Sequence, residues 1–474
     1  MGIQDMMQTG RSGMIAAKAG ISTTGHNIAN ANTEGYSRQR VHQQTNDPVT
    51  SPDHRSFVGR GVNVSRIDRV NDGYLEKQIR RGSMDLAELE EKDLGLTQIE
   101  DIFNELHGDG LNRIISKFFN QFRSLSNDPD NESLRQAVRE ASQSVINDFK
   151  RLRTDVIDVQ NHLDNRIEGY VQDVNRLAKE IRDLNVRIAD YESRAEPAND
   201  LMDHRDIKIK ELSDLIETRV RYDKKNMVSV DLKGGGPLVS TVLNYELSVK
   251  RTGSDDEGKS TGTYDIFSNV SSPGKLTHSL QGGKLGGTLN VRDRSLNTVL
   301  SRLDEMAFNI AKTVNEIHRQ GVTRNGVKGV NFFKEPVQVH RASEYLKLSD
   351  EVMSNVNFIA TAATKDAPGD NRIAIAISGL QDMKLMNDGK SSFDEWYNGI
   401  VADVGMAKSH NTEGINQQKN IVGQLNKMRE QISGVSIDEE TMDLMKYQHA
   451  FDASARVISV ADQMLETVLN IKKL

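Results

Sequence analysis

The N-terminal stretch of this chain carries the repeat of a coiled-coil helix. Apolar or small residues recur there in alternating steps of four and three. They are Ile3, Met7, Gly10, Met14, Ala17, Ile21, Thr24 and Ile28. The pattern predicts one helix of about 39 Å. Its glycines each cost roughly 1 kcal/mol relative to alanine, so we expect this helix to be stable only when it packs against a partner.

The C-terminal stretch carries a second heptad helix with a wider apolar face. Ser436 and Glu439 have the spacing of a capping box, which predicts the start of a helix, and the periodicity continues to Leu474. Two stripes with seven-residue spacing lie next to each other: Leu444, Phe451, Ile458 and Leu465 in the first, and Ala450, Val457, Met464 and Ile471 in the second. This face is too wide for one partner helix. We therefore expect neighbours on more than one side.

Between these ends, most of the chain has helical periodicity. A polar loop is expected over residues 43–61, with a short strand after it. Helices are predicted over residues 71–103, 111–125, 149–191 and 201–216. From residue 219 the apolar period changes to two among many glycines, which predicts short strands and turns. Helical periodicity resumes at Leu296 and, after a loop-rich stretch, at Ser392.

These patterns predict a mainly α protein with an inserted β domain. The N- and C-terminal helices (residues 1–70 and 435–474) should pair as a coiled coil, and residues 71–218 and 290–434 should form a long helical-bundle rod domain. Residues 219–289 should form one small outer β domain. Exposed apolar faces of this size favour aggregation in a free monomer, so we expect the terminal helices to be disordered until assembly orders them.

Several sequence blocks resemble one protein family. The segment Asn27-Ile28-Ala29-Asn30, with Thr33 and Gly35-Tyr36-Ser37-Arg38-Gln39, resembles the N-terminal signature of bacterial flagellar axial proteins, and its ending resembles the hook-associated protein 1 family. Further blocks of that family are recognisable in order along essentially the whole chain. They lie at residues 198–206, 314–321, 433–440 and 447–465.

The resemblance implies a structural subunit that joins the flagellar hook to the filament. It implies a location in the extracellular flagellum, reached by export without a cleaved signal peptide. The implied partners are the hook protein, the second hook–filament junction protein, further copies in a ring, an export chaperone at the C-terminal helix, and the export apparatus. Some family members carry further outer domains. The β region of this chain has about seventy residues, which leaves room for one small domain only.

The terminal helices and the loop after them are the expected assembly interface. Its candidate residues are Ile3, Met7, Met14, Ile21, Ile28, Asn30, Asn32, Gly35, Tyr36, Leu444, Phe451, Ile458 and Leu465. We expect side chains such as Ile21, Phe451 and Ile458 to pack between subunits. On this interpretation, Ile458→Asp leaves the isolated subunit folded and abolishes its incorporation.

Composition argues against several other classes of protein. The net charge of −7 is small and the basic residues are dispersed, which disfavours nucleic acid as a partner. The sequence lacks a run of eighteen apolar residues, so membrane insertion is not expected. It contains no cysteine, which excludes disulfides and thiolate metal sites. We expect no cofactor, no metal and no enzymatic activity.

Three alternatives remain open at this point. The chain could be another flagellar axial protein, either the hook subunit or the second junction protein. It could be a monomeric helical protein whose terminal helices pack together in its own core. The third alternative is a nucleotide-binding enzyme, because residues 253–260 fit the pattern of a phosphate-binding loop. Three consecutive acidic residues inside that loop would repel a triphosphate.

Overall fold

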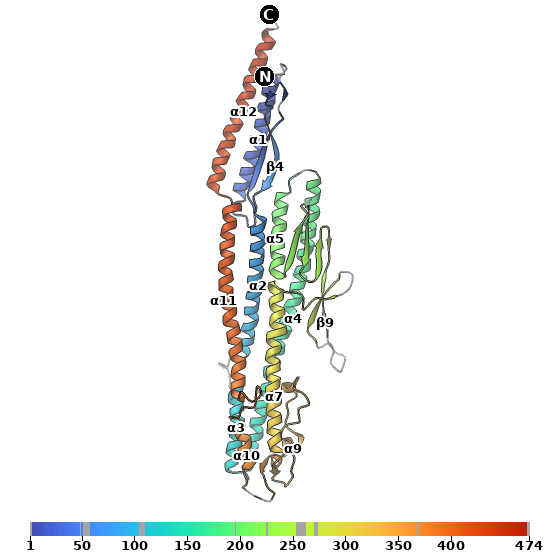
Figure 1. The fold of residues 1–474 in the computed structure, drawn as a ribbon, viewed down its shortest axis with the longest axis vertical. Helices are drawn as coiled ribbons and strands as arrows, with labels where there is room; N and C mark the ends of the chain where they lie inside the picture. Colours follow the sequence, from blue (N-terminus) through green and yellow to red (C-terminus); the bar gives the residue numbers. More distant parts are fainter. Residues whose placement is uncertain are drawn as a thin grey trace.

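The computed structural model describes residues 2–47, 49–50, 57–103, 110–194, 196–223, 226–252, 262–269, 274–365, 367 and 369–471. The molecule is a long rod of helices, with both chain ends at one end and a small β region on one side (Figure 1). It is 65% helical. The predicted fold class, mainly α with paired terminal helices and an inserted β region, is confirmed.

The two terminal helices lie side by side at one end of the rod. Helices α1 (Ile3–Ala29) and α12 (Ile437–Ile471) run antiparallel (Figure 1). Strands β1 (Gln39–Thr45) and β4 (Val62–Arg69) form an antiparallel ribbon along α1, and β2 (Val49–Thr50) pairs with β3 (Phe57–Val58). The expected loop over residues 43–61 is therefore partly strand. Its polar sequence hid this, because a two-stranded ribbon that covers a single helix needs few apolar residues.

Long helices form the rod. They are α2 (Gly73–Ile102), α3 (Leu111–Asn127), α4 (Glu132–Ser193), α5 (Asn199–Leu215), α7 (Asn297–His318) and α11 (Phe393–Ser433). Helix α4 begins at Glu132, earlier than the predicted residue 149. The Asn131 side chain caps this start by accepting hydrogen bonds from the Ser133 and Leu134 amides, at 3.0 and 3.3 Å.

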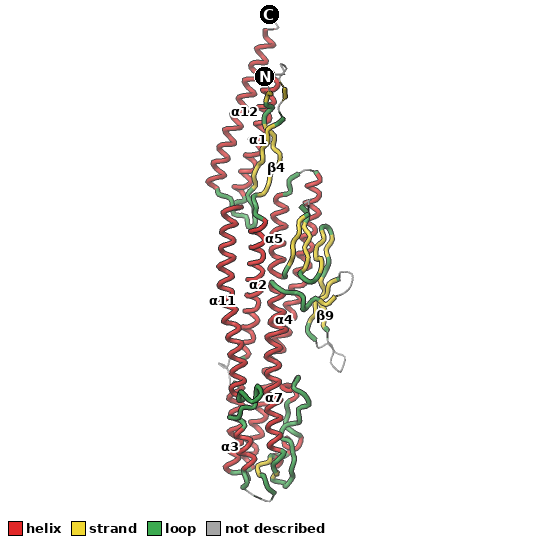
Figure 2. The backbone as a smooth tube through the Cα atoms, in the orientation of Figure 1, coloured by secondary structure: helices red, strands yellow, loops and turns green. Residues whose placement is uncertain are grey.

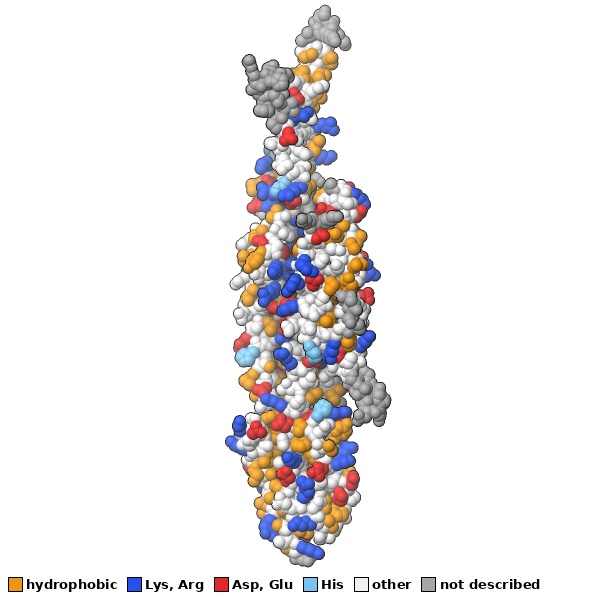
Figure 3. Space-filling view, turned by 45° about the vertical axis from the view of Figure 1, so that its right-hand side comes forward, with side chains coloured by type: hydrophobic (Ala, Val, Ile, Leu, Met, Phe, Trp, Pro, Cys, Tyr) orange, Lys and Arg blue, Asp and Glu red, His pale blue; other side chains and the backbone are white. Residues whose placement is uncertain are grey.

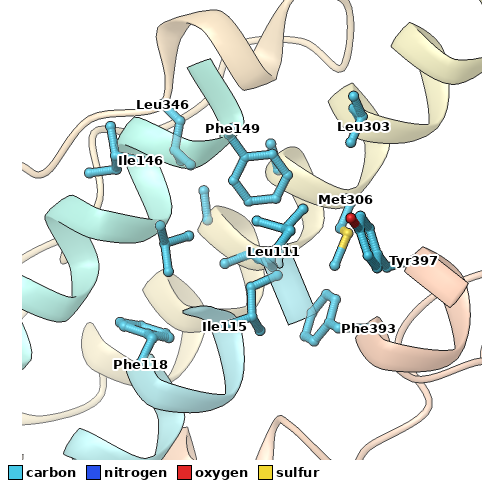
Figure 4. Close-up of a cluster of buried hydrophobic side chains, with 14 of the residues drawn as sticks. Leu111, Ile115, Phe118, Ile146, Phe149, Leu303, Met306, Leu346, Phe393 and Tyr397 are labelled. Carbon is cyan, nitrogen blue, oxygen red and sulfur yellow. The ribbon is translucent and has the colours of Figure 1, made fainter. Parts of the chain in front are cut away.

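An apolar core fills the end of the rod opposite the chain termini. Figure 4 shows side chains from four helices meeting there: Ile115 and Phe118 of α3, Phe149 of α4, Leu303 of α7 and Phe393 of α11. All five are fully buried or nearly so. The short elements around this core are β12 (Val322–Thr323), α8 (Ala342–Tyr345), α9 (Asp350–Ser354), η3 (Val356–Phe358), β13 (Ala360–Ala362) and α10 (Arg372–Gly379).

The β region packs against one side of the rod (Figure 2). Strands β5 (Thr218–Tyr222), β6 (Val228–Leu232), β7 (Gly236–Ser240) and β8 (Leu243–Asn244) form an antiparallel sheet, and β9 (Leu247–Arg251), β10 (Tyr264–Ser268) and β11 (Gly274–Lys275) form a second. Val228 and Val230 share one apolar cluster with Val174 and Ile181 of α4. The strands therefore pack on the rod helices instead of forming a core of their own.

Helical structure resumes earlier than the predicted Leu296. Helix α6 (Gly283–Asn290) lies, except for its last residue, within the range assigned to the β domain, and a π-helical turn η2 (Val291–Leu296) joins it to α7. Several glycines made α6 look like a loop. Gly287 explains why they are there: a Cβ atom at this position would lie 2.5 Å from the backbone oxygen of Glu88 on α2. The glycines allow α6 to approach α2 closely.

Buried ion pairs connect α4 to its neighbours at several levels of the rod. Arg153 pairs with Asp304 of α7 at 2.9 Å, and Asp164 pairs with Arg292 of η2 at 2.7 Å. Higher on the rod, Arg166 pairs with Glu91 of α2 at 2.5 Å. Because a buried charge needs its partner in one place, these pairs oppose sliding of the helices along each other.

The block at residues 314–321 holds the long loop at the end of α7. The Asn315 side chain donates to the Phe333 carbonyl and accepts from the Phe332 and Phe333 amides. His318 is fully buried, with Nδ1 2.7 Å from the Val330 carbonyl and Nε2 accepting from the Ala360 amide at 2.8 Å. Both hydrogen bonds require a neutral imidazole with its proton on Nδ1.

This histidine predicts a loss of stability in acid. Burial lowers the pKa of His318 from 6.5 to about 4. Between these values the unfolded chain binds a proton that the folded chain does not, so the free energy of unfolding falls by about 3 kcal/mol as the pH drops from 7 to 4. Urea unfolding followed by fluorescence measures this loss, because the only tryptophan, Trp396, packs against the same core.

The His318→Gln variant is the control for this prediction. Glutamine can donate and accept in place of the imidazole but does not titrate. The variant should therefore lose about 3 kcal/mol less than the parent over the same pH range. Equal losses in both proteins would show that His318 is not the group that titrates.

Candidate functional site

The inner stripe of α12 faces α1. Its members recur in steps of three and four and are buried or half-buried. They are Glu440, Leu444, Tyr447, Phe451, Ser454, Ile458, Ala461 and Leu465. This set contains all four interface candidates that were predicted on α12. These four candidates therefore belong to the coiled-coil seam between α12 and α1 of the same chain.

On α1 the seam is made of small residues. They are Gly10, Gly13, Ala17, Gly20, Thr24 and Asn27, and five of the six are buried. A Cβ atom at Gly20 would lie 2.5 Å from the Tyr447 ring, and one at Gly10 would lie 2.7 Å from Ile458. These glycines let the bulky side chains of α12 reach the α1 backbone. They are thus the contact surface that stabilises the pair.

The predicted α1 seam is partly right. It shares Gly10, Ala17 and Thr24 with the observed seam, and Ile3 is half-buried at the start of the helix. The other four predicted residues lie half-buried beside it: Met7, Met14, Ile21 and Ile28. Close helix contact is made instead at Gly13 and Gly20, one position before Met14 and Ile21, because they lack a side chain.

The placement of Ile458 corrects one expectation. Its side chain contacts α1 of the same chain at Gly10. A change of Ile458 to aspartate would therefore also disturb the helix pair within the subunit, so it cannot test contacts between subunits alone.

The outer face of α12 is apolar and exposed. The exposed fraction is 38% for Val457, 43% for Val460, 46% for Met464 and 55% for Val468. Figure 3 shows hydrophobic side chains on the projecting helix at this end of the molecule. Ala450, Val457 and Met464 of the predicted second stripe are exposed, as two-sided packing of this helix requires. We call Val457, Val460, Met464 and Val468 the outer stripe.

Asn27 links the end of α1 to α12. Its side-chain nitrogen donates to the Gln39 carbonyl and to Glu440, both at 2.9 Å. Its side-chain oxygen accepts from the Tyr36 hydroxyl at 2.7 Å and from the Gln39 amide at 3.0 Å. Asn27 is 1% exposed and Glu440 2%. One amide side chain therefore closes the turn after α1 and binds the first turns of α12.

Arg38 supplies the charge that Glu440 needs. Its Nε lies 2.6 Å from Glu440, and its Nη1 lies 2.9 Å from the exposed Glu439. The Arg38 amide also donates to the Ser433 carbonyl at the end of α11, at 3.0 Å. Arg38 thus contacts both the end of α11 and the start of α12.

The first turns of α5 complete the same cluster. Arg69 binds Asp203 at 2.8 Å and Asp206 at 3.0 Å, and the Ser37 amide donates to Asp203. Burial raises the pKa of Asp203, and the Arg69 charge opposes that rise. Asp200 accepts from the Gln39 side chain at 2.8 Å. The ribbon and the turn after α1 are therefore held to α5 by polar contacts.

The predicted loop candidates have different places in this cluster. Asn30 caps α1, donating from its side chain to the His26 carbonyl, whereas Asn32 is exposed. Gly35 has a φ of +78°, and Ile207 lies 2.5 Å from where its Cβ would be, so larger residues are disfavoured there. Burial and nearby carboxylates raise the pKa of the Tyr36 hydroxyl, which keeps it a hydrogen-bond donor to Asn27.

Three sequence blocks that are far apart in the chain thus meet in one place. They are residues 27–39, 198–206 and 433–440, and we call their meeting point the polar joint. Among the described residues, none of the three apolar clusters includes a residue of α1 or α12. Hydrogen bonds and ion pairs therefore carry the connection between the terminal pair and the rod.

Four residues of the polar joint were missed as site candidates. Asn27, Arg38 and Glu440 were recognised only as parts of family blocks, and Asp203 likewise. The signal that could have identified them is the concentration of polar residues at seam positions, since Asn27 and Glu440 each occupy a heptad position that usually holds an apolar residue.

The described part of the chain contains neither a metal-binding cluster nor a membrane-spanning helix. It contains no group of three or more His, Cys, Asp or Glu side chains arranged to hold a metal ion. None of its helices combines the length and apolarity needed to cross a bilayer. The phosphate-loop pattern at residues 253–260 lies outside the described residues.

Comparison with known proteins agrees with the placement of these elements. The profile described as "Flagellar hook-associated protein FlgK helical domain" matches residues 96–333. "Flagella basal body rod protein" matches residues 7–36, which include α1, and "Flagellar basal body rod FlgEFG protein C-terminal" matches residues 430–471, which include α12. The N- and C-terminal helices of the chain therefore both resemble segments of flagellar rod proteins.

Similar proteins span nearly the whole chain. Flagellar hook-associated protein 1 of Bacillus subtilis is 30% identical over 98% of this chain and 97% of its own length. The Salmonella typhimurium protein of that name is 25% identical, covering 97% of this chain and 98% of its own. The solved flagellar hook junction protein FlgK of Burkholderia pseudomallei shares the fold, with a TM-score of 0.66, 17% identity, and coverage of 75% of this chain and 100% of its own. The chain belongs to the flagellar hook-associated protein 1 family.

Proposed function

We propose that this subunit joins hook to filament by packing the outer stripe of α12 against neighbouring subunits. The inner stripe is used within the chain, where it holds α12 on α1. The polar joint then sets the direction of this helix pair relative to the rod. Assembly on this account requires no bond-making step.

Membership of the family makes the chain a structural component of the flagellar hook–filament junction. This separates it from the two alternatives of a hook subunit and a second junction protein. Several finer points belong to our proposal: the hook protein, the second junction protein and further copies as direct partners, an export chaperone at the C-terminal helix, and export without a cleaved signal peptide. We also propose that the subunit is not an enzyme.

The observation that carries the proposal is the exposure of the outer stripe. Four apolar side chains follow one another on α12, each between 38% and 55% exposed. A row of this kind on a projecting helix is typical of a surface that another protein covers. Helix α1 leaves this row uncovered, because it packs on the neighbouring inner stripe.

We further propose that the terminal pair is loosely ordered before assembly. Helix α1 carries four glycines that lower its intrinsic helix propensity. The described residues of the pair also contribute nothing to the three apolar clusters of the rod. Neighbouring subunits would then supply the burial that orders it fully.

Electron microscopy of cells that lack this chain tests the proposed function. We expect hooks without filaments, with filament protein released into the medium. Restoring the chain from a plasmid is the control and should restore filaments. Normal filaments in the deletion strain would contradict a role at the junction, and the absence of hooks would place the chain earlier in assembly.

A further inference from the structure

The end of the rod opposite the termini contains a cavity with a buried cation. Its volume is about 610 Å³. It lies where the turn before α4, the paired strands β12 and β13, and the loop after β13 meet, at the lower end of the molecule in Figure 1. The cationic side chains that line it are Arg135, Arg324 and Lys365. This cavity is separate from the polar joint and from the outer stripe.

Arg135 is held rigidly on the cavity wall. It is 1% exposed and stands in the second turn of α4. Its Nε and Nη2 donate to the Pro129 carbonyl at 3.0 and 2.6 Å, its Nη1 donates to the Ile359 carbonyl at 2.6 Å, and its Nη2 donates to the Thr361 hydroxyl at 3.1 Å. Four of its five N–H groups are thus used.

All of these acceptors are neutral. A buried guanidinium keeps its full charge at neutral pH, and burial without an opposite charge costs several kcal/mol. Desolvation and the nearby Arg324 lower the pKa of Arg135 to about 10, while Asp130 opposes this. Among the described residues, none of the carboxylates forms an ion pair with Arg135. Its hydrogen bonds are therefore satisfied, and its charge is not.

The other charges of the cavity leave a positive excess. Arg324 and Lys365 are exposed and form no ion pair with a described residue. The Asp370 carboxylate is already engaged by Arg372 at 2.9 Å and by the Ala363 amide at 2.8 Å. Asp130 is exposed at the rim and is the remaining carboxylate among the described lining residues. Among the lining residues that the structure describes, three cations thus face one free carboxylate.

We propose that this cavity binds a small oxyanion, which Arg324 and Lys365 contact from the rim while Arg135 supplies charge from the wall. Carboxylates and phosphates both accept several charge-assisted hydrogen bonds from such a set. The source is either free phosphate or an acidic side chain of a neighbouring protein. The proposal is independent of the outer stripe, since the two sites lie at opposite ends of the molecule (Figure 1).

Titration calorimetry of the full chain tests this site. Sodium phosphate and sodium glutarate, which represents an acidic side chain, are titrated separately at an ionic strength held constant with sodium chloride. We expect one of them to bind. In the Arg324→Ser/Lys365→Ser double variant its affinity should fall at least roughly tenfold, because two charged contacts are lost. Both residues are exposed, so the variant should fold normally.

Lys334→Ser is the matched control. Lys334 is an exposed cation on the same loop-rich end but does not line this cavity, so its loss should leave the affinity unchanged. Tighter binding of phosphate would identify the free ion as the ligand, and tighter binding of glutarate would identify a protein carboxylate. Absence of binding by both anions, or equal affinity in the double variant and the parent, would overturn the proposal.

Discussion

Replacing Val457 and Val460 together with aspartate should abolish incorporation of the chain into flagella while its rod remains folded. Both side chains lie outside the inner stripe and are 38% and 43% exposed, so the free chain has room for the carboxylates. Covering two carboxylates in an apolar interface would cost about 5 kcal/mol or more in total, which corresponds to a roughly thousandfold or greater loss of affinity. Circular dichroism of the purified chain and immunolabelling of flagella measure the two parts of this prediction.

The control places the same substitutions on another exposed apolar pair. Val242 and Leu243, at the β7–β8 turn, are 47% and 58% exposed. Their double aspartate variant should assemble like the parent. Detection of each variant in the culture medium separates failed assembly from failed export. Normal flagella built with the Val457 and Val460 variant would show that the outer stripe is not an interface.

Replacing Arg292 with methionine should destabilise the rod by about 3–5 kcal/mol. Arg292 and Asp164 are 1% and 2% exposed and pair at 2.7 Å. Without the guanidinium, the Tyr264 amide, 3.2 Å away, is the one hydrogen-bond donor left to the buried Asp164 carboxylate among the described residues. Urea unfolding followed by circular dichroism measures the loss, because α4 and its neighbours supply most of the helical signal.

Two further variants identify the cause of that loss. The Asp164→Leu/Arg292→Met double variant removes both charges and should regain most of the lost stability. Arg176→Met removes an arginine whose pairs with Asp173 and Glu180 lie on the exposed surface of the same helix. It should cost less than about 1 kcal/mol. If the Arg292 variant were as stable as the Arg176 variant, the pair would not be a connection that stabilises the rod.

Periodicity predicted the helices of this protein well. The heptad pattern at each end identified α1 and α12, and the change of period near residue 219 identified the inserted strands. Helix α6 was missed because a glycine-rich sequence reads as a loop unless its neighbour is known. Gly287 is required by the approach of the Glu88 backbone on α2, and that contact is not visible along the chain.

The polar joint could not be predicted from the sequence, because its contacts join residues that are far apart in the chain. The pairs Arg38–Glu440 and Arg69–Asp203 join residues separated by 402 and 134 positions. No local pattern indicates which carboxylate an arginine will reach. The family blocks showed that these residues matter together, but only the fold shows that they form one joint. The cavity at Arg135 was likewise not predictable from the sequence, since its walls come from three separate segments.

The most direct test of the central claim is the accessibility of residue 460 in assembled flagella. The chain has no cysteine, so V460C provides a single reactive thiol on the outer stripe and V242C provides one on the β region. Both should react with a maleimide in the free chain. We predict that V460C becomes protected after assembly while V242C stays reactive. Equal labelling of V460C in free and assembled protein would contradict packing of the outer stripe between subunits.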